Sequence, residues 1–299
     1  MHDHILYKKR TLESIVLIIL GYFGYAVSDT VAKILQDHYN VFQVMGVNAV
    51  LALCILTPWI HFKYGIKTIF PPNLKLHLLR ACFVFATAYL MVRSLHLLPL
   101  ADFYGIAFTI PFFTMFLAYA ILKERVGWHR IMAAVFGFGG VLIIAGPQFE
   151  HIGHGVALAL GGAVVASFNI IVLRKIGHGA PIPVYGFWPF LFLAVGSAIA
   201  LLINGEARAI QMEDVKFIFL APPFTVLGIA ALSLGFTRAP DTTIVSPFHY
   251  TQIIWGVSFG WLFFQTLPPL TTYVGIAMII CAGCYSLWRE YKRKHHIPD

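Results

Sequence analysis

Two charged side chains stand one helical turn apart inside an otherwise apolar stretch near the N-terminus. Asp29 and Lys33 are four residues apart with the acid first, which places them on one helix face in the order that favours an ion pair. A charge at the centre of a bilayer costs about 2.5–3.5 kcal/mol on the insertion scale, so it is rarely present without a purpose. Two interpretations remain open: a self-neutralising pair, or a polar lining for a substrate path.

Three further polar side chains lie deep in apolar stretches. Arg93 could pair with Asp29 or Asp102, or hold a carboxylate or phosphate of a substrate, because its guanidinium donates in a planar fork. His249 and Gln252 are three residues apart and share a helix face. A histidine at this depth could relay protons or bind a substrate, or could be satisfied by a neighbouring carbonyl.

Amides and aromatic rings complete the candidate set. Amides inside apolar stretches serve as contacts between helices or as ligand contacts, and rings can enclose planar or cationic organic groups. The candidate substrate-path residues are Tyr25, Asp29, Asn48, Tyr89, Arg93, Phe112, Asn169, Trp188, His249, Tyr250, Gln252 and Trp255. Prolines predict kinks and hinges at Pro111, Pro222, Pro223 and Pro247, and the adjacent pair is expected to break its helix.

The composition requires membrane-spanning elements to position these residues. Of 299 residues, 59% are hydrophobic and only 11% are charged, which excludes a soluble enzyme or a DNA-binding domain. A membrane helix needs roughly 20 apolar residues. Helices are preferred over a β-barrel because the stretches are apolar on all sides. The sequence predicts ten spans at 14–35, 40–62, 76–97, 100–122, 129–146, 154–176, 182–204, 215–236, 241–264 and 270–288.

The positive charges predict the orientation of these spans. If the N-terminus is cytoplasmic, 17 of the 21 Lys and Arg residues fall in cytoplasmic segments, so both termini are expected in the cytoplasm. The net charge of +8 then reflects topology and is compatible with contact with anionic lipids, and it gives no evidence for nucleic acid.

The two halves of the chain repeat weakly. Gly21 corresponds to Gly161 and Asp29 to Asn169 at a constant offset of 140 residues. A duplicated unit with five spans must insert its second copy upside down, as in many secondary transporters. The predicted organisation is an N-terminal cytoplasmic segment at 1–13, five-helix repeats at 14–146 and 154–288, and a basic cytoplasmic tail at 289–299.

Three motifs resemble a known family. The segment 111–144 combines a mid-helix proline, Glu-Arg at a turn and a Gly-rich helix; 97–102 and 247–268 supply a matching turn and ninth helix. The chain therefore resembles the ten-helix EamA-type members of the drug/metabolite transporter superfamily. The segment 28–35 is similar to S-adenosylmethionine uptake transporters. The resemblance implies a 5+5 inverted repeat, a central cavity lined by helices 1, 3, 4, 6, 8 and 9, and transport without ATP.

The leading interpretation is a secondary transporter that moves a small organic metabolite, a zwitterion or cation, across a bacterial inner membrane by alternating access. Protons or an exchanged metabolite could couple transport, and the chain could act as a monomer or homodimer. A multidrug or metabolite exporter, a passive channel and a membrane enzyme remain alternatives. No cofactor or metal site is expected, because clustered carboxylates and HExxH are missing from the sequence.

Overall fold

The computed structural model describes residues 2–123, 128–145, 149–177, 180–239 and 246–294, and within these ranges its regular structure is helical. Asn40 starts the second long helix, because its side chain accepts a hydrogen bond from the Phe42 amide. The helices are α1 (His2–Leu35), α2 (Val41–Tyr64), η1 (Ile66–Ile69), α3 (Leu74–Leu97), α4 (Leu100–Ala107), α5 (Ile110–Leu122), α6 (Trp128–Ala145), α7 (Phe149–Ile176), α8 (Ile182–Asn204), α9 (Val215–Arg238), η3 (Ser246–Tyr250), α11 (Thr251–Phe264) and α12 (Leu270–Lys294).

Seven helical stretches in the described ranges are long and apolar enough to cross a membrane. Backbone groups have no water partners in hydrocarbon, so a helix satisfies them internally. The stretches are Lys9–Leu35, Val41–Tyr64, Leu74–Leu97, Leu100–Ile121, Gly153–Ile176, Ile182–Asn204 and Val215–Arg238, with shorter apolar helices at Ile131–Ile144 and Leu270–Ser286. Residues 241–245 of the predicted ninth span lie outside the described ranges.

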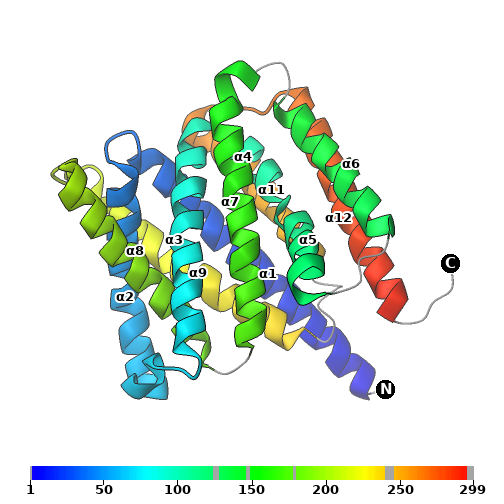
Figure 1. The fold of residues 1–299 in the computed structure, drawn as a ribbon, viewed down its shortest axis with the longest axis horizontal. Coiled ribbons are helices and arrows are strands. Elements are labelled where there is room, and N and C mark those ends of the chain that lie inside the picture. The colour runs from blue at the N-terminus through cyan, green and yellow to red at the C-terminus, as the bar shows by residue number, and fades with distance from the viewer. Residues whose placement is uncertain (1, 124–127, 146–148, 178–179, 240–245, 295–299) are drawn as a thin grey trace.

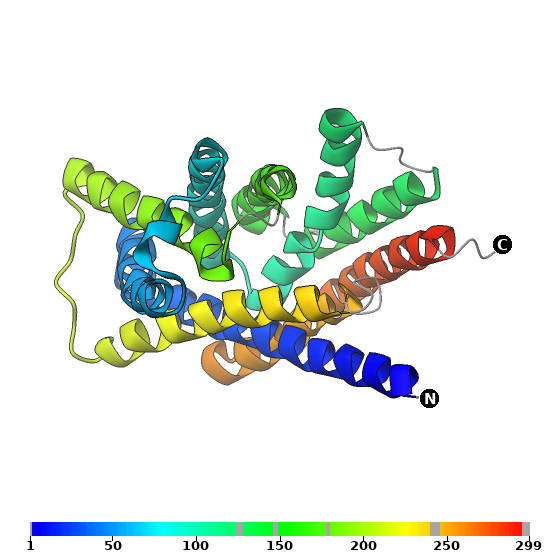
Figure 2. The same ribbon diagram turned by 90° about the horizontal axis from the view of Figure 1, so that it is seen from below.

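The long helices pack in pairs that join the two halves of the chain (Figure 1). The principal pairs are α1 with α9, α3 with α7, α6 with α12 and α2 with α8, while α4 packs on α11. If each helix is replaced by its counterpart in the other half of the chain, the α1–α9 pair becomes the α7–α3 pair. The other pairs are converted into themselves. Figure 2 shows α1 and α9 running along each other, with the first turn of α1 and the end of α12 on the same side of the bundle.

The predicted fourth span is divided into two helices. The regular α-helix ends at Ala107 and resumes at Ile110, with Phe108 and Thr109 in a turn, and Pro111 occupies the first turn of α5. Proline lacks an N–H, so this turn loses nothing there, whereas a continuous helix would lose a bond. In the other half, Pro247 lies in the short helix η3 immediately before α11. Both helices therefore change geometry near a proline.

The proline pair of the predicted eighth span does not break its helix, contrary to expectation. The helix α9 continues through Pro222 and Pro223 from Val215 to Arg238. Pro222 is buried, and α9 packs along the length of α1. In a membrane, a break in the helix would leave backbone groups without hydrogen-bond partners, so packing against a neighbouring helix favours a continuous α9.

Small residues bring α1 and α9 into close contact. A Cβ at Gly24 would lie 2.7 Å from the Phe224 carbonyl oxygen, and one at Gly228 would lie 2.8 Å from the Tyr25 ring. Glycine permits the two backbones to approach, as is common between membrane helices. The two helices are therefore joined closely at this level.

Candidate functional site

A cavity of about 210 Å³ lies among α1, α2, α3, α8 and the start of α9. Most of its lining is apolar, with a few polar groups, which is the usual make-up of a site for a small organic molecule. It occupies the half of the bundle that contains the connection from α1 to α2, here called the α1–α2 end; the connection from α2 to α3 defines the opposite, α2–α3 end. The polar lining residues are Tyr25, Ser28, Asp29, Tyr39, Gln43, Asn48 and Thr225.

Asp29 is the carboxylate of this cavity. It is half-buried in α1, and its Oδ2 accepts a hydrogen bond of 2.9 Å from the hydroxyl of Tyr104 in α4. The side chain of Gln252 interacts with the same hydroxyl. No ion pair to Asp29 occurs within the described ranges. A carboxylate held by a neutral donor keeps its negative charge available to a ligand.

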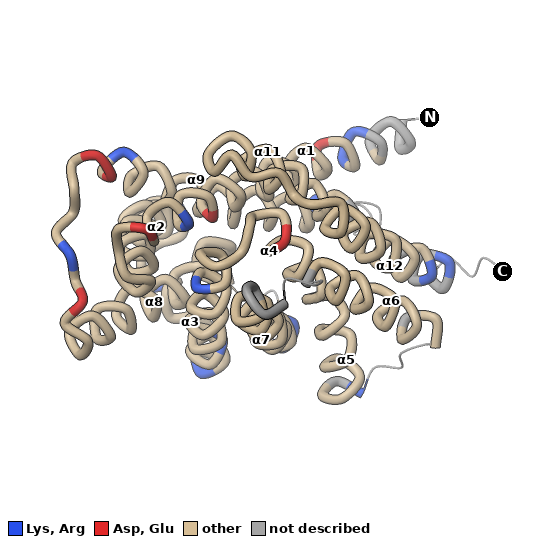
Figure 3. Tube along the Cα trace, turned by 90° about the horizontal axis from the view of Figure 1, so that it is seen from above, with Lys and Arg blue, Asp and Glu red and all other residues tan. Residues whose placement is uncertain are grey.

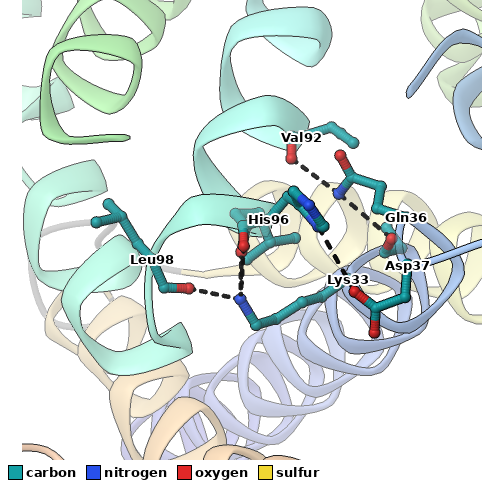
Figure 4. Close-up of polar contacts among 8 residues, drawn as sticks. Lys33, Gln36, Asp37, Val92, His96 and Leu98 are labelled. Atoms are coloured by element: carbon teal, nitrogen blue, oxygen red, sulfur yellow. Dashed lines mark hydrogen bonds and ion pairs between the residues drawn. The ribbon is translucent and has the colours of Figure 1, made fainter. Parts of the chain in front are cut away.

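Lys33 is not the partner of Asp29, so the self-neutralising pair is wrong. Its Nζ donates to the carbonyl oxygens of Leu95 at 2.6 Å, Leu98 at 2.7 Å and His96 at 3.4 Å (Figure 4). These carbonyls end α3, where no further turn supplies N–H donors and the helix dipole is negative. Lys33 therefore joins α1 to the end of α3, where the carbonyl oxygens stabilise its positive charge.

A hydroxyl and amide network lines the wall beside Asp29. The hydroxyls of Ser28 and Thr225 are 2.6 Å apart, and Thr225 also donates to the Ala221 carbonyl at 3.0 Å. The Asn48 amide reaches Thr225 at 3.5 Å, while its Oδ1 is buried with no partner among the described residues. The free Oδ1 is an acceptor that a ligand with N–H groups could use.

The segment between α8 and α9 closes the cavity at the α1–α2 end. Gln43 and Arg208 exchange two hydrogen bonds, from Gln43 Nε2 to the Arg208 carbonyl at 2.6 Å and from the Arg208 amide to Gln43 Oε1 at 3.0 Å. Asp214 Oδ2 lies 2.9 Å from His38 Nδ1 and accepts from the Tyr39 hydroxyl at 2.8 Å. Figure 3 shows charged residues of this segment at the edge of the bundle.

Asp214 is an ionised anchor for this closure. Burial raises the pKa of its carboxyl. Hydrogen bonds from His38 and Tyr39, together with the positive charge of Lys216, lower this pKa by more than burial raises it. The net result is a pKa below the ordinary value, so the closed segment is stabilised by the ionised carboxylate.

Arg93 lies outside the Asp29 cavity. It lines a second, polar cavity of about 480 Å³ with residues 36–40 and 205–208, and Tyr39 borders both cavities. The two acids considered as partners are engaged elsewhere: Asp29 accepts from Tyr104, and Asp102 from Thr272 at 2.6 Å. Arg93 therefore lines a separate cavity, which shares Tyr39 with the Asp29 cavity.

The candidates of the ninth span gather in an aromatic cluster. His249 stacks on Tyr22 with ring centroids 4.5 Å apart and meets the Phe108 ring at 4.9 Å. The Tyr250 ring contacts Phe108 at 5.1 Å, and Trp255 contacts another α1 ring, Phe23, at 5.0 Å. These rings join α1 to the break in the predicted fourth span, and none borders the Asp29 cavity.

The remaining candidates are dispersed. Tyr89 stacks on Phe42 at 5.2 Å, Phe112 packs against α6, and the Oδ1 of Asn169 is buried without a partner in the described chain. Trp188 donates to the Ile69 carbonyl at 2.7 Å, at the α2–α3 end. Of the predicted path residues, only Tyr25, Asp29 and Asn48 line the cavity.

Five polar residues of the site were not predicted from the sequence: Ser28, Tyr39, Gln43, Tyr104 and Thr225. Hydroxyls in membrane helices often bond their own backbone, as Thr225 does with Ala221. Their types therefore carry no signal of a site. Only their position beside Asp29 and Asn48 in the fold reveals it.

Both halves of the chain match the EamA-like transporter family, over residues 12–146 and 153–288. An S-adenosylmethionine uptake transporter of Rickettsia conorii is 23% identical over 292 residues, covering 96% of this chain and 97% of that protein. A riboflavin transporter of Brucella anthropi is 24% identical over 245 residues, covering 81% and 86%. A crystal structure with 14% identity has the same fold, with a TM-score of 0.64 and coverage of 96% and 98%.

Proposed function

The chain belongs to the EamA-like transporter family, a family of multi-pass membrane proteins, and on that premise we propose that it is a secondary transporter of a small organic metabolite bearing a cationic or amino group. Amino acids, S-adenosylmethionine-like compounds and other zwitterions or cations make up this class. The relatives named for S-adenosylmethionine and riboflavin support a small-molecule substrate.

The single observation that carries this substrate class is the environment of Asp29. Its carboxylate borders an otherwise largely apolar cavity, and the nearest lysine on α1 is committed to the end of α3. A buried negative charge in a membrane protein is costly without a counter-charge. A positively charged substrate group supplies that counter-charge, while the apolar walls take the rest of the molecule.

The proposed architecture is ten membrane helices in a 5+5 inverted repeat, with repeats at 14–146 and 154–288. The paired family matches and the exchange of helix pairs between the halves support it. The proposed location is a bacterial inner membrane with both termini in the cytoplasm. In this orientation the α1–α2 end faces outward and the α2–α3 end faces the cytoplasm.

The proposed cycle alternates access to Asp29. Contacts between Gly24 and Gly228 and their partners close the inner side, and the segment 205–214 closes the outer side. Rocking of one half against the other would open one closure at a time, with Pro111 and Pro247 as hinges beside the interrupted helices. The continuous course of α9 makes Pro222 and Pro223 weaker hinge candidates.

Protons or an exchanged metabolite are the proposed coupling partners. Asp29 borders the cavity, whereas His249 is stacked among aromatic rings, so Asp29 is the better placed proton carrier. Uptake into proteoliposomes with and without an imposed pH gradient separates the two forms of coupling. Indifference to the gradient, together with acceleration by internal substrate, identifies exchange.

The test of the substrate class begins with a thermal-shift screen of purified protein against amino acids, amines, S-adenosylmethionine, riboflavin and neutral hydrophobic drugs. Hits are then measured for saturable, counterflow-stimulated uptake. Asp29→Asn should abolish binding of cationic hits and Asp29→Glu should retain part of it. Asp102→Asn, which removes a carboxylate remote from the cavity, is the matched control for general destabilisation. Binding of neutral drugs alone, unaffected by Asp29→Asn, would overturn the proposal.

A further inference from the structure

Arg80 is a half-buried arginine in the second turn of α3, and it interacts electrostatically with Tyr25 of the Asp29 cavity. Its Nη1 donates to the Tyr185 carbonyl oxygen at 2.5 Å. Its Nε is buried and has no partner among the described residues. An arginine carries five N–H donors in a planar fork. The structure thus leaves part of this fork uncommitted.

Tyr25 connects Arg80 with the cavity. The Tyr25 side chain borders the cavity and lies within electrostatic range of both Asp29 and Arg80. Its ring packs on Gly228, where α1 and α9 make their close contact. Tyr25 therefore forms the floor of the cavity at the end away from the α1–α2 connection, and both the Asp29 carboxylate and the Arg80 guanidinium act on it.

A second unsatisfied polar group stands beside Arg80. His77 is three residues earlier on the same face of α3, and its side chain is 1% exposed. Both ring nitrogens of His77 are without a partner in the described chain, although the ring packs 5.4 Å from the Tyr185 ring. Buried polar atoms normally find hydrogen bonds, so two neighbouring residues with open positions indicate a missing partner.

We propose that Arg80, with His77 beside it, binds an anionic group of the transported molecule after the Tyr25 floor opens toward the inner side. This rests on the proposed function: Asp29 holds the amino group and Arg80 supplies the opposite charge. The substrate is then an amphoteric molecule, with a carboxylate or phosphate as well as an amino group. Arg93, in the outer polar cavity, meets the anionic group only on approach.

The structural alternative gives Arg80 no ligand. In that case its single bond to the Tyr185 carbonyl ties α3 to α8, and the charge has no effect on which compounds bind. The two roles differ in one measurable respect. A ligand contact distinguishes compounds with and without a carboxylate, whereas a helix tie affects all compounds equally.

The experiment compares amino acids with their decarboxylated amines in the full-length protein. The probe pairs are tyrosine and tyramine, histidine and histamine, and lysine and cadaverine. Affinity and proteoliposome uptake are measured for wild type, Arg80→Gln, Arg80→Lys and Asp29→Asn. Wild type should prefer the carboxylate member of at least one pair by roughly 10–100-fold, the range expected for a hydrogen bond between charged groups.

Arg80→Gln should remove this preference while amine binding persists, and Arg80→Lys should restore part of it. Equal binding of both members by wild type overturns the inference without using any variant. If amines bind in a manner that requires Asp29, but no pair shows a preference for the carboxylate member, the inference about Arg80 is overturned and the proposed function is not. Failure of every pair to bind overturns the amino-group substrate class as well. Equal loss for both members in Arg80→Gln, with a lower melting temperature, identifies the helix tie and overturns the ligand role.

Discussion

The hydroxyl of Tyr104 donates a hydrogen bond of 2.9 Å to the carboxylate of Asp29, joining the first helix of the chain to the broken fourth span. Tyr104 is 1% exposed and is held against Gly256 of α11. The carboxylate is thus positioned by a rigid neutral donor from the centre of the bundle. Any movement of α4 relative to α1 acts directly on the charge that borders the cavity.

Tyr104→Phe should weaken binding of cationic substrates by roughly tenfold, because the carboxylate loses the donor that orients it. The fold should survive, since the ring and its packing remain. Substrate titration of the purified variant measures the change. Tyr285→Phe, which removes an exposed hydroxyl bonded to His129, is the control and should bind normally. Unchanged affinity in Tyr104→Phe would show that the bond does not position Asp29 for binding.

Lys33→Met should lower the melting temperature, because three carbonyl oxygens at the end of α3 lose their cationic donor. The expected cost is about 2 kcal/mol, as for a cation at a helix C-terminus in a partly buried setting. Lys33→Arg should keep most of the stability. Lys9→Met removes an exposed lysine near the start of α1, and it should change stability little. A loss no larger than that of Lys9→Met would contradict the capping role.

Gly283→Ala should destabilise the contact between α12 and η3. A Cβ at Gly283 would overlap the Tyr250 hydroxyl oxygen, which forces one of the two groups to move at a cost of about 1–3 kcal/mol. The double variant Gly283→Ala/Tyr250→Phe should recover part of this loss. Gly139→Ala is the control, because its nearest neighbour would be the Met278 Cε at 3.5 Å. Thermal unfolding in detergent compares wild type, Gly283→Ala, Tyr250→Phe, the double variant and Gly139→Ala. Additive effects of the two substitutions would rule out the clash.

Asp214→Asn should reduce the stability of the segment between α8 and α9 near neutral pH, and this effect should disappear in acid. The folded pKa of Asp214 lies below the ordinary value of 3.8, because hydrogen bonds and nearby positive charge outweigh burial. Its contribution is therefore fully present above pH 3.8 and disappears as the pH falls through the lower folded value. The melting temperatures of wild type and variant should converge across that window. A difference that persists or grows in acid would assign the stabilisation to another group.

The sequence by itself was sufficient to recognise a helical membrane chain and a family of transporters. Long stretches that are apolar on all sides have one stable form in a bilayer, and this reasoning needs no tertiary information. The same reasoning identified Asp29, because a carboxylate within such a stretch is conspicuous. It also identified Pro111 as a site of altered helix geometry, although it wrongly predicted a break at Pro222 and Pro223.

Only the tertiary structure decided which partner each polar residue meets. Lys33 stands one turn from Asp29 yet bonds to the end of α3, and Arg80 lies half-buried and interacts electrostatically with Tyr25. A helix that is apolar all round carries no local signal for its rotation about its own axis. That rotation follows from close contacts such as Gly24 against Phe224, which join residues 200 positions apart in the chain.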